Sequence, residues 1–317
     1  MKSFAFVFPG QGSQAVGMLD AWGDHPAVAE VLREASDALD EDVARLIHDG
    51  PKEALALTTN TQPVMLVAGV AAWRAWLAEG GAKPAVVAGH SLGEYAALVA
   101  SGVLTLAQAA PLVRFRAQAM QQAVPVGVGA MAAVLGMDAE KVKAGCAEVT
   151  ASFGAGSSEI VEAVNFNDPM QTVIAGSKAA VDKACEVLKS QGAKRALPLP
   201  VSAPFHSSLM RPAADALRER LASLDLAAPQ IPVLNNIDVA VESEAGRMRD
   251  ALVRQAAGPV RWVESVLALK ARGVDVVIEC GPGKVLTGMA KRIAPELAAA
   301  SVYDPATLAE TRQLLGA

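Results

Sequence analysis

Short apolar runs alternate with longer helical segments along this 317-residue chain. Residues 4–8, 85–89 and 274–280 are mostly Val, Phe, Ala and Ile, and each ends at or next to Gly or Pro, a pattern typical of buried strands in a parallel sheet. A further short strand is predicted at 231–237. Helices are predicted for the longer segments: 27–57 with loops at 40–42 and 48–51, 61–80, from Leu106 onward, 208–224, 245–257 and 260–272. The last predicted element is a helix that carries Lys291 and Arg292.

The middle of the chain has a different pattern. Strand-like runs at 127–137, 160–167, 171–177 and 193–199 alternate with helical segments at 138–152 and 178–192. This β-α-β-β-α-β order is the ferredoxin-like arrangement. We therefore predict an α/β protein: a large α/β-hydrolase-like core with a parallel sheet, formed by residues 1–125 and 201–317, and an inserted ferredoxin-like subdomain at residues 126–200. A cleft is expected between the two parts.

The run at 85–89 leads into Gly89-His90-Ser91-Leu92-Gly93 and then into a helical segment. A strand, a tight Gly-x-Ser-x-Gly turn and a helix form a nucleophile elbow, which lifts the serine hydroxyl above the sheet. The backbone N–H of Leu92, the residue after the serine, is placed to donate to an oxyanion. Ser91 is thus a candidate nucleophile.

A serine hydroxyl needs a base to become nucleophilic at neutral pH. His25 and His48 lie in polar, loop-like surroundings typical of the surface, and His90 points away from its neighbour Ser91 in an elbow. His206 follows the inserted segment, where it could reach the cleft, and is the candidate base. For a third member, Asp138, Asp168 and Asp182 all lie in the insertion, so a Ser–His dyad is the more economical prediction.

Residues Gly10–Ala15 match the dinucleotide fingerprint Gly-x-Gly-x-x-Ala. The segment that follows is helical and does not return to a second strand with an acidic end, which weakens that interpretation. The same loop can bring backbone donors to the edge of the sheet where the elbow lies. Gln11 is therefore a candidate second oxyanion donor.

Composition excludes several functions. The net charge is −5 and no long basic run is present, which argues against nucleic-acid binding. Three cysteines are far apart, as expected for reduced residues of a cytoplasmic protein. No signal peptide or membrane span is recognisable, and no metal or cofactor site is predicted.

Six short motifs occur in a characteristic order: Phe8–Gln14, Gly89–Glu94, Arg116-x-x-x-Met120-Gln121, Val164–Asn167, Pro204–Ser207 and Glu279–Gly283. Together they resemble the malonyl-CoA:acyl carrier protein transacylases of fatty acid synthesis over essentially the whole chain. The resemblance implies ping-pong transfer of a malonyl group from malonyl-CoA to acyl carrier protein by a cytoplasmic monomer.

The resemblance also implies roles for individual residues. Ser91 would be acylated, His206 would be its base, and the N–H groups of Gln11 and Leu92 would form the oxyanion hole. Arg116 would grip the malonyl carboxylate, because a guanidinium makes two parallel bonds to a carboxylate. The backbone carbonyl of Gln255 would orient the histidine, which leaves little importance for its side chain. The remaining implied substrate-binding residues of the cleft are Gln62, Asn165, Phe205 and His90.

Three other functions remain open on sequence. A serine hydrolase or thioesterase could use the same elbow, a dinucleotide-dependent oxidoreductase rests on Gly10–Ala15, and a non-catalytic carrier-binding module would not need Ser91. An acidic carrier protein would need a basic docking patch on this acidic chain. The candidates for that patch are Lys284, Lys291, Arg292, Lys189, Lys194 and Arg195.

Overall fold

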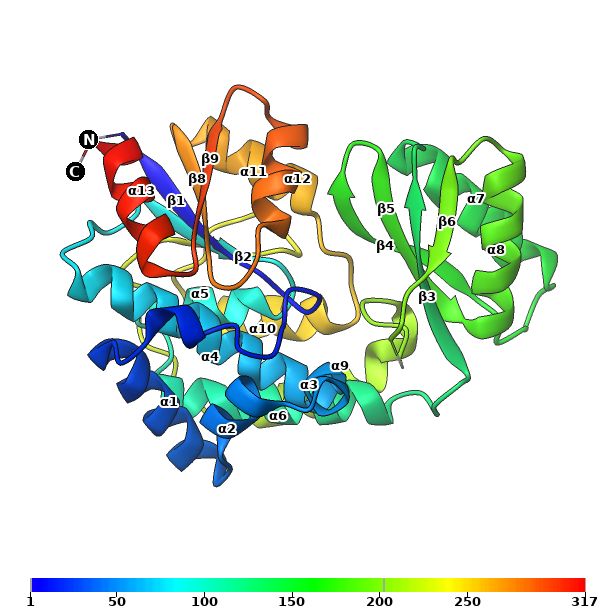
Figure 1. Cartoon of the computed structure of the whole chain (residues 1–317). Helices are drawn as coiled ribbons and strands as arrows, with labels where there is room; N and C mark the ends of the chain where they lie inside the picture. The colour runs from blue at the N-terminus through cyan, green and yellow to red at the C-terminus, as the bar shows by residue number, and fades with distance from the viewer. Residues whose placement is uncertain (1, 202, 317) are drawn as a thin grey trace.

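Two β-sheets of different type organise the molecule (Figure 1). The computed structural model describes residues 2–201 and 203–316; Ser202, in the predicted loop before His206, lies outside them. One sheet has five strands in the order β7-β2-β1-β8-β9, all parallel, and the other has four antiparallel strands in the order β4-β5-β3-β6. The predicted α/β class is confirmed.

The parallel sheet and its helices form the large lobe. Its strands are β1 (Phe4–Phe8), β2 (Val86–Gly89), β7 (Val233–Leu234), β8 (Val276–Cys280) and β9 (Ala298–Val302). Alternate residues of β1 face two separate cores, with Phe6 in one and Val7 in the other, because helices cover both faces of the sheet. This explains why β1, β2 and β7 are apolar throughout.

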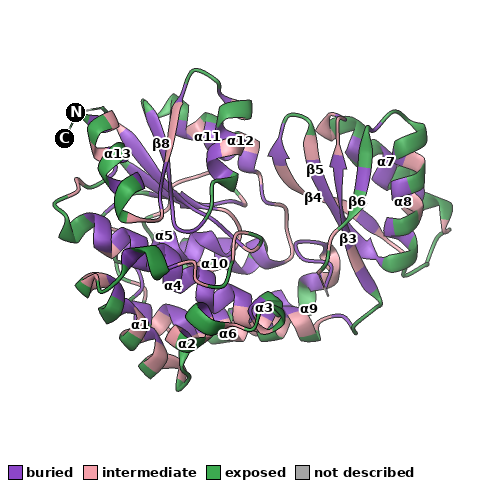
Figure 2. Ribbon diagram, in the orientation of Figure 1, coloured by how far each residue is buried: buried purple, intermediate pink, exposed green. Residues whose placement is uncertain are grey.

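Helices of the large lobe carry the predicted apolar segments. They are α1 (Pro26–Leu39), α2 (Val43–Asp49), α3 (Lys52–Ala56), α4 (Thr58–Ala78), α5 (Gly93–Ala100), α6 (Leu106–Gln122), α9 (Arg211–Ala222), α10 (Ala245–Ala256), α11 (Trp262–Ala271), α12 (Val285–Ile293) and α13 (Pro305–Leu315). Figure 2 shows buried residues concentrated in the sheet and in α4 and α5. No helix in the described part of the chain combines the length and apolar character needed to cross a membrane.

The antiparallel sheet forms the small lobe with two helices. Its elements follow the predicted order: β3 (Gly129–Leu135), α7 (Ala139–Ser152), β4 (Val161–Asp168), β5 (Gln171–Ser177), α8 (Lys178–Ser190) and β6 (Arg195–Pro198). Asp138 caps α7 by accepting from the N–H of Lys141. One face of the sheet packs on α7 and α8, whereas Met131 and Val173 on the other face belong to the core of the large lobe.

Two sequence predictions about the large lobe were wrong. The helix carrying Lys291 and Arg292 is not the last element, because β9 and α13 follow it. The β9 sequence Ala-Ala-Ala-Ser-Val has little intrinsic strand preference, and parallel pairing with β8 imposes the extended form. The strand predicted at 231–237 is only two residues long, since the chain turns after Leu234.

Backbone and side-chain bonds join the lobes. The Phe166 N–H donates to the Val260 carbonyl at 3.0 Å, and the Val260 N–H donates to the Val164 carbonyl at 2.8 Å. Arg292 of α12 also donates to Asp168 at the end of β4, at 2.7 Å. These contacts fix the edge of the small sheet against the large lobe.

Helix α5 lies so close to β1 that only glycine fits at its first residue. A Cβ at Gly93 would lie 2.0 Å from the Phe8 carbonyl oxygen. We expect Gly93→Ala to lower the free energy of unfolding by about 1–3 kcal/mol, the usual range for overpacking. Gly246→Ala, in α10 where an added Cβ meets nothing, is the matched control and should be neutral or stabilising. Urea titration would measure both, and equal stabilities would contradict the expectation.

Candidate active site

Ser91 lies in the turn between β2 and α5, with its backbone in the left-handed region at φ 52°. Non-glycine residues rarely adopt this conformation, and they do so mainly where the surrounding structure holds them there. A Cβ at Gly10 would lie 2.7 Å from the His90 carbonyl oxygen. The loop after β1 therefore passes directly beside the elbow.

His206 lies within hydrogen-bonding distance of Ser91. Its Nε2 is 2.6 Å from Ser91 Oγ, and its Nδ1 is 2.9 Å from the Gln255 carbonyl oxygen. Because a carbonyl can only accept, Nδ1 carries the proton, and Nε2 is free to accept the Ser91 proton. The backbone carbonyl takes the place that a carboxylate has in a triad.

The three aspartates considered from sequence have other roles. Asp138 caps α7, Asp182 pairs with Lys178, and Asp168 accepts from Arg292. The arrangement is a Ser–His pair without an acidic third member among the described residues.

Burial keeps His206 neutral. Loss of solvation, with a smaller contribution from the neighbouring Arg116 cation, lowers the pKa of His206 to about 3. Its side chain is buried, and its backbone, like that of Ser91, is left-handed, at φ 66°. At neutral pH the imidazole is thus unprotonated and able to act as a base.

Arg116 of α6 brings a buried positive charge to the serine. It is 1% exposed and donates to Gln62 Oε1 at 2.7 Å, to Gln255 Oε1 at 3.0 Å and to Ser91 Oγ at 3.2 Å. Among the described residues no carboxylate forms an ion pair with it, and burial lowers its pKa. A buried cation held by amide and hydroxyl oxygens and by the face of the Tyr95 ring, without a carboxylate in an ion pair, is suited to binding an anion.

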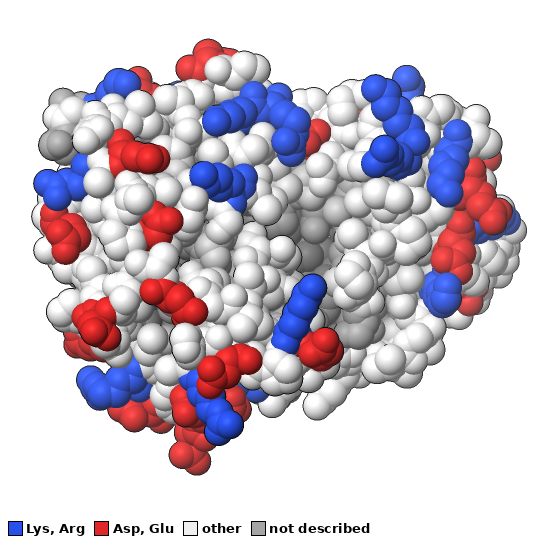
Figure 3. All heavy atoms as spheres, in the orientation of Figure 1, with Lys and Arg blue, Asp and Glu red and all other residues white. Residues whose placement is uncertain are grey.

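A cavity of about 110 Å³ lies in front of this group. The sequence-predicted residues that line it are Gln11, Gln62, His90, Ser91, Leu92, Arg116, Asn165, Phe205 and His206. Apolar walls come from Met131, Leu199 and Val201, which no sequence motif indicated. A larger, more open groove of about 1030 Å³ also borders His206 but lacks Ser91 and Arg116. Figure 3 shows the surface hollowed between the lobes.

Two backbone donors are available at the cavity. Gln11 and Leu92 both line it, and within residues 2–201 and 203–316 neither backbone N–H donates a hydrogen bond to the protein. Leu92 is also the N-cap of α5, whose N-terminal dipole favours negative charge. An oxyanion on a carbonyl attacked by Ser91 would therefore meet unused donors.

The Gln255 side chain contacts three residues of the site. It is fully buried, and its Nε2 donates to the Ser91 carbonyl at 3.0 Å and to Glu94 Oε2 at 2.9 Å, while its Oε1 accepts from Arg116. These contacts place the side chain, and not only the backbone carbonyl, in the hydrogen-bond network of the site. The sequence resemblance pointed only to its backbone carbonyl.

Glu94 and Asn236 were not recognised as site residues from sequence. Both are buried, and the Asn236 N–H donates to Glu94 Oε2 at 2.9 Å. Burial raises the pKa of Glu94 to about 7. Glu94 is the last residue of the motif Gly89–Glu94, and Asn236 lies near the end of the strand predicted at 231–237. Neither position in the sequence reveals the contact between these two residues.

The remaining predicted residues form the cavity walls. His90 Nε2 lies 2.8 Å from Asn167 Oδ1, and burial lowers the pKa of His90. Asn165 Oδ1 is buried without a hydrogen-bond partner among the described residues, so it is available to a ligand. Phe205 is 8% exposed.

The structure does not favour the dinucleotide interpretation of Gly10–Ala15. The loop leads into helices α1 to α3 and not into a second strand, and Gly10 serves its close approach to His90. Among the described residues no cluster of three acidic, His or Cys side chains could hold a metal ion.

Comparison with known proteins agrees with this geometry. Residues 5–310 match the family model of the acyl transferase domain. The chain is 50% identical to the malonyl CoA-acyl carrier protein transacylase of Escherichia coli K12, covering 99% of this chain and all of that protein, and 50% identical to that of Salmonella typhimurium, covering 97% and 98%.

Solved structures are equally similar. An acyl-carrier-protein S-malonyltransferase from Burkholderia pseudomallei is 63% identical with a TM-score of 0.95, covering 98% of this chain and 99% of that one. A malonyl-transacylase solved in complex with its type II PKS acyl-carrier protein is 48% identical with a TM-score of 0.95, covering 98% and 99%.

The depressed pKa of His206 predicts how Ser91 reactivity depends on pH. A base with its pKa near 3 stays neutral as pH falls, so labelling of Ser91 by a fluorophosphonate should keep most of its rate from pH 8 to pH 5. An unperturbed imidazole would halve the rate near pH 6.5. Intact-protein mass against time measures the rate, with His206→Ala as the unreactive control, and a midpoint near pH 6.5 would contradict the assignment.

Proposed function

As a member of the acyl transferase family, this chain transfers a malonyl group from malonyl-CoA to acyl carrier protein, and we propose that Ser91 carries the group between them as an ester. The observation that supports this most directly is the geometry of Ser91, His206 and Arg116. It combines a nucleophile, a neutral base and an anion-binding cation around one small cavity.

The first half-reaction forms the ester. His206 Nε2 takes the Ser91 proton as Oγ attacks the thioester carbonyl, and the N–H groups of Gln11 and Leu92 stabilise the resulting oxyanion. Loss of one such donor typically costs about 2.7–4 kcal/mol. The tetrahedral intermediate collapses with cleavage of the C–S bond, and the departing CoA sulfur receives the proton from His206.

The second half-reaction repeats these steps with another thiol. The phosphopantetheine thiol of acyl carrier protein gives its proton to His206 and attacks the malonyl ester, and Ser91 leaves with that proton. The entering and leaving groups are the same kind of thiol, so ping-pong kinetics and ready reversal follow.

Arg116 gives the site its preference for a dicarboxylic acyl group. The malonyl carboxylate would accept two parallel bonds from the guanidinium and take the place of the Gln62 and Gln255 oxygens. This charge also argues against the alternative of a plain serine hydrolase or thioesterase on the same core. A neutral acyl group would leave Arg116 without a negative partner.

Architecture supports a finer fold description. We assign residues 1–125 and 201–317 to an α/β-hydrolase-like catalytic subdomain and residues 126–200 to a ferredoxin-like subdomain. The elbow at the end of β2, an interior strand of the parallel sheet, supports the first, and the β-α-β-β-α-β order with strand order β4-β5-β3-β6 supports the second. Fatty acid synthesis is the pathway we assign.

Further properties complete the proposal. The enzyme acts as a cytoplasmic monomer without a cofactor or metal. Cys146, Cys185 and Cys280 are buried and unpaired, which suits a reducing compartment.

Docking of the acidic carrier is assigned to exposed cations, and Figure 3 shows Lys and Arg side chains on the surface on both sides of the hollow. Lys284, Lys291, Lys189, Lys194 and Arg195 are exposed, although Lys284 also lies over the Tyr303 ring. Arg292 is exposed too, but it also pairs with Asp168 across the lobes. A charge reversal at Arg292 would therefore disturb the fold as well as docking.

Replacement of Arg116 should separate malonyl from acetyl transfer. Loss of two charge-assisted bonds, each worth about 1.5–3 kcal/mol, predicts that Arg116→Ala slows malonyl loading of Ser91 by about 100-fold or more, with little loss of acetyl loading. Arg114→Ala is the matched control, since Arg114 lies on the same helix but binds Asn60 and Glu41. Intact-protein mass after brief mixing with each thioester measures the adduct.

Three outcomes of that experiment would contradict the proposal. Equal effects on malonyl and acetyl loading would remove the role of Arg116. Release of CoA without any adduct would favour the hydrolase, and an adduct that survives Ser91→Ala would exclude Ser91 as the nucleophile.

Charge reversal at Lys291 tests the docking surface. An exposed charge pair contributes up to about 1 kcal/mol, so Lys291→Glu should raise the Michaelis constant for acyl carrier protein about fivefold while leaving that for malonyl-CoA unchanged. Lys52→Glu, on exposed helix α3 of the large lobe, is the control. If both variants give the same Michaelis constants, carrier docking does not use Lys291.

A further inference from the structure

The left-handed backbone of Ser91 needs support from outside the turn. A non-glycine residue at φ 52° is strained and persists only when its surroundings determine it. The orientation of the Ser91 hydroxyl and of the Leu92 N–H both depend on this one residue's backbone. The contacts that hold the Ser91 backbone therefore control the geometry of the reaction.

Asn236 spans the turn with its side-chain amide. Its Oδ1 accepts from the Ser91 N–H at 2.7 Å, and its Nδ2 donates to the Gly89 carbonyl at 2.6 Å. The side chain is 0% exposed and does not line the cavity, so it cannot touch the substrate. It follows β7, which pairs with β2 in the parallel sheet and so delivers Asn236 beside the elbow.

Glu94 anchors this clamp. One oxygen, Oε2, accepts from the Asn236 N–H at 2.9 Å and from Gln255 Nε2 at 2.9 Å, and Gln255 Nε2 also donates to the Ser91 carbonyl at 3.0 Å. The N–H and the C=O of Ser91 are thus each held by a side-chain amide, and both residues also donate to one carboxylate, Asn236 through its backbone N–H and Gln255 through its side chain.

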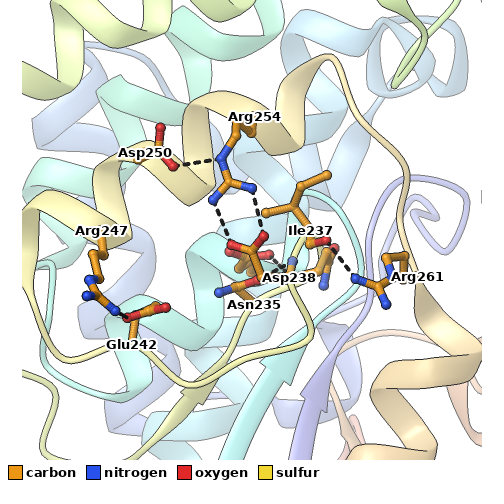
Figure 4. Close-up of polar contacts among 10 residues, drawn as sticks. Asn235, Ile237, Asp238, Glu242, Arg247, Asp250, Arg254 and Arg261 are labelled. Carbon is orange, nitrogen blue, oxygen red and sulfur yellow. Dashed lines mark hydrogen bonds and ion pairs between the residues drawn. The ribbon is translucent and has the colours of Figure 1, made fainter.

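The loop that carries Asn236 is itself fastened from outside (Figure 4). Arg254 makes two bonds of 2.7 Å to the Asp238 carboxylate and one of 2.6 Å to Asp250, and Arg261 donates to the Ile237 carbonyl at 3.2 Å. Asn235 Oδ1 accepts from the Asp238 N–H at 2.8 Å. Helix α10 supplies both Arg254, which binds the loop at Asp238, and Gln255, which binds the Ser91 carbonyl.

We propose that Asn236 is a positioning residue for the acyl transfer, which holds the Ser91 backbone so that Oγ points at His206 while the Leu92 N–H points into the cavity. The inference rests on the proposed role of Ser91 as nucleophile. The position requires an acceptor toward Ser91 and a donor toward Gly89 on one planar group. Asparagine supplies both, leucine supplies neither, and aspartate supplies both only when it is protonated.

Two variants, Asn236→Asp and Asn236→Leu, test this requirement. An ionised aspartate at position 236 would face the Gly89 carbonyl with an acceptor, whereas the protonated acid restores the donor. Among titratable groups, Glu94 faces Asn236 directly, with Asp238 on the same loop and Arg116 and His206 beyond Gln255. The wild type contains the same titratable groups, so its dependence of rate on pH is the reference for the variants.

The experiment is single-turnover malonylation of Ser91 from malonyl-CoA, followed by intact-protein mass between pH 5.5 and 8.5. We expect Asn236→Asp to lose at least tenfold in the maximal rate at pH 8, with an unchanged half-saturating malonyl-CoA concentration because the Arg116 contacts remain. Its rate should recover as pH falls, unlike that of the wild type. Asn236→Leu should be slow at every pH.

Asn235→Asp is the matched control, because it adds the same charge one residue away and keeps the oxygen that accepts from Asp238. It should follow the wild-type profile; if it reproduces the Asn236→Asp profile, the effect comes from charge and the inference is wrong. Full activity of Asn236→Asp at pH 8, or a profile without recovery at low pH, would also overturn it. If Ser91→Ala keeps malonyl transfer, the proposed nucleophile fails instead.

Discussion

The left-handed backbone of Ser91 is the constraint on which the active site depends. Placing the hydroxyl above the sheet requires helix α5 to begin almost in contact with β1, which only glycine at position 93 allows. The strained turn is then held by side chains from two distant segments, Asn236 after β7 and Gln255 on α10. The reactive geometry is thus a property of the parallel sheet and its neighbours, and the motif alone could not maintain it.

Around this turn, burial controls the charge states of the groups that contact Ser91. Burial keeps His206 neutral, and the Gln255 carbonyl selects the tautomer in which Nε2 accepts the Ser91 proton. Arg116 is buried without an ion-pair partner among the described residues, an arrangement that is suited to binding an anion. The Gln255 side-chain amide connects this cation to Glu94. It accepts from Arg116 and donates to the Ser91 carbonyl and to the Glu94 carboxylate.

The small lobe adds walls and not catalytic groups. Met131, Asn165 and Leu199 close the cavity from its sheet, while backbone bonds from β4 to Val260 fix that sheet against the large lobe. The cavity is thus enclosed by residues of both lobes. The large lobe therefore supplies Ser91, His206 and Arg116, and the small lobe supplies walls of the cavity.

Sequence by itself determined the strands that are apolar on both faces, the β-α-β-β-α-β segment and the motif residues Ser91, His206 and Arg116, because periodicity and motif spacing are local properties. It did not predict β9, whose alanine-rich residues become a strand only by pairing with β8. Nor did it reveal the buried bonds of Glu94 to Gln255 and to Asn236, which join residues more than 140 positions apart. Only the tertiary structure decided these, because a hydrogen bond between distant segments depends on how the sheet and helices pack and leaves no periodic trace in the sequence.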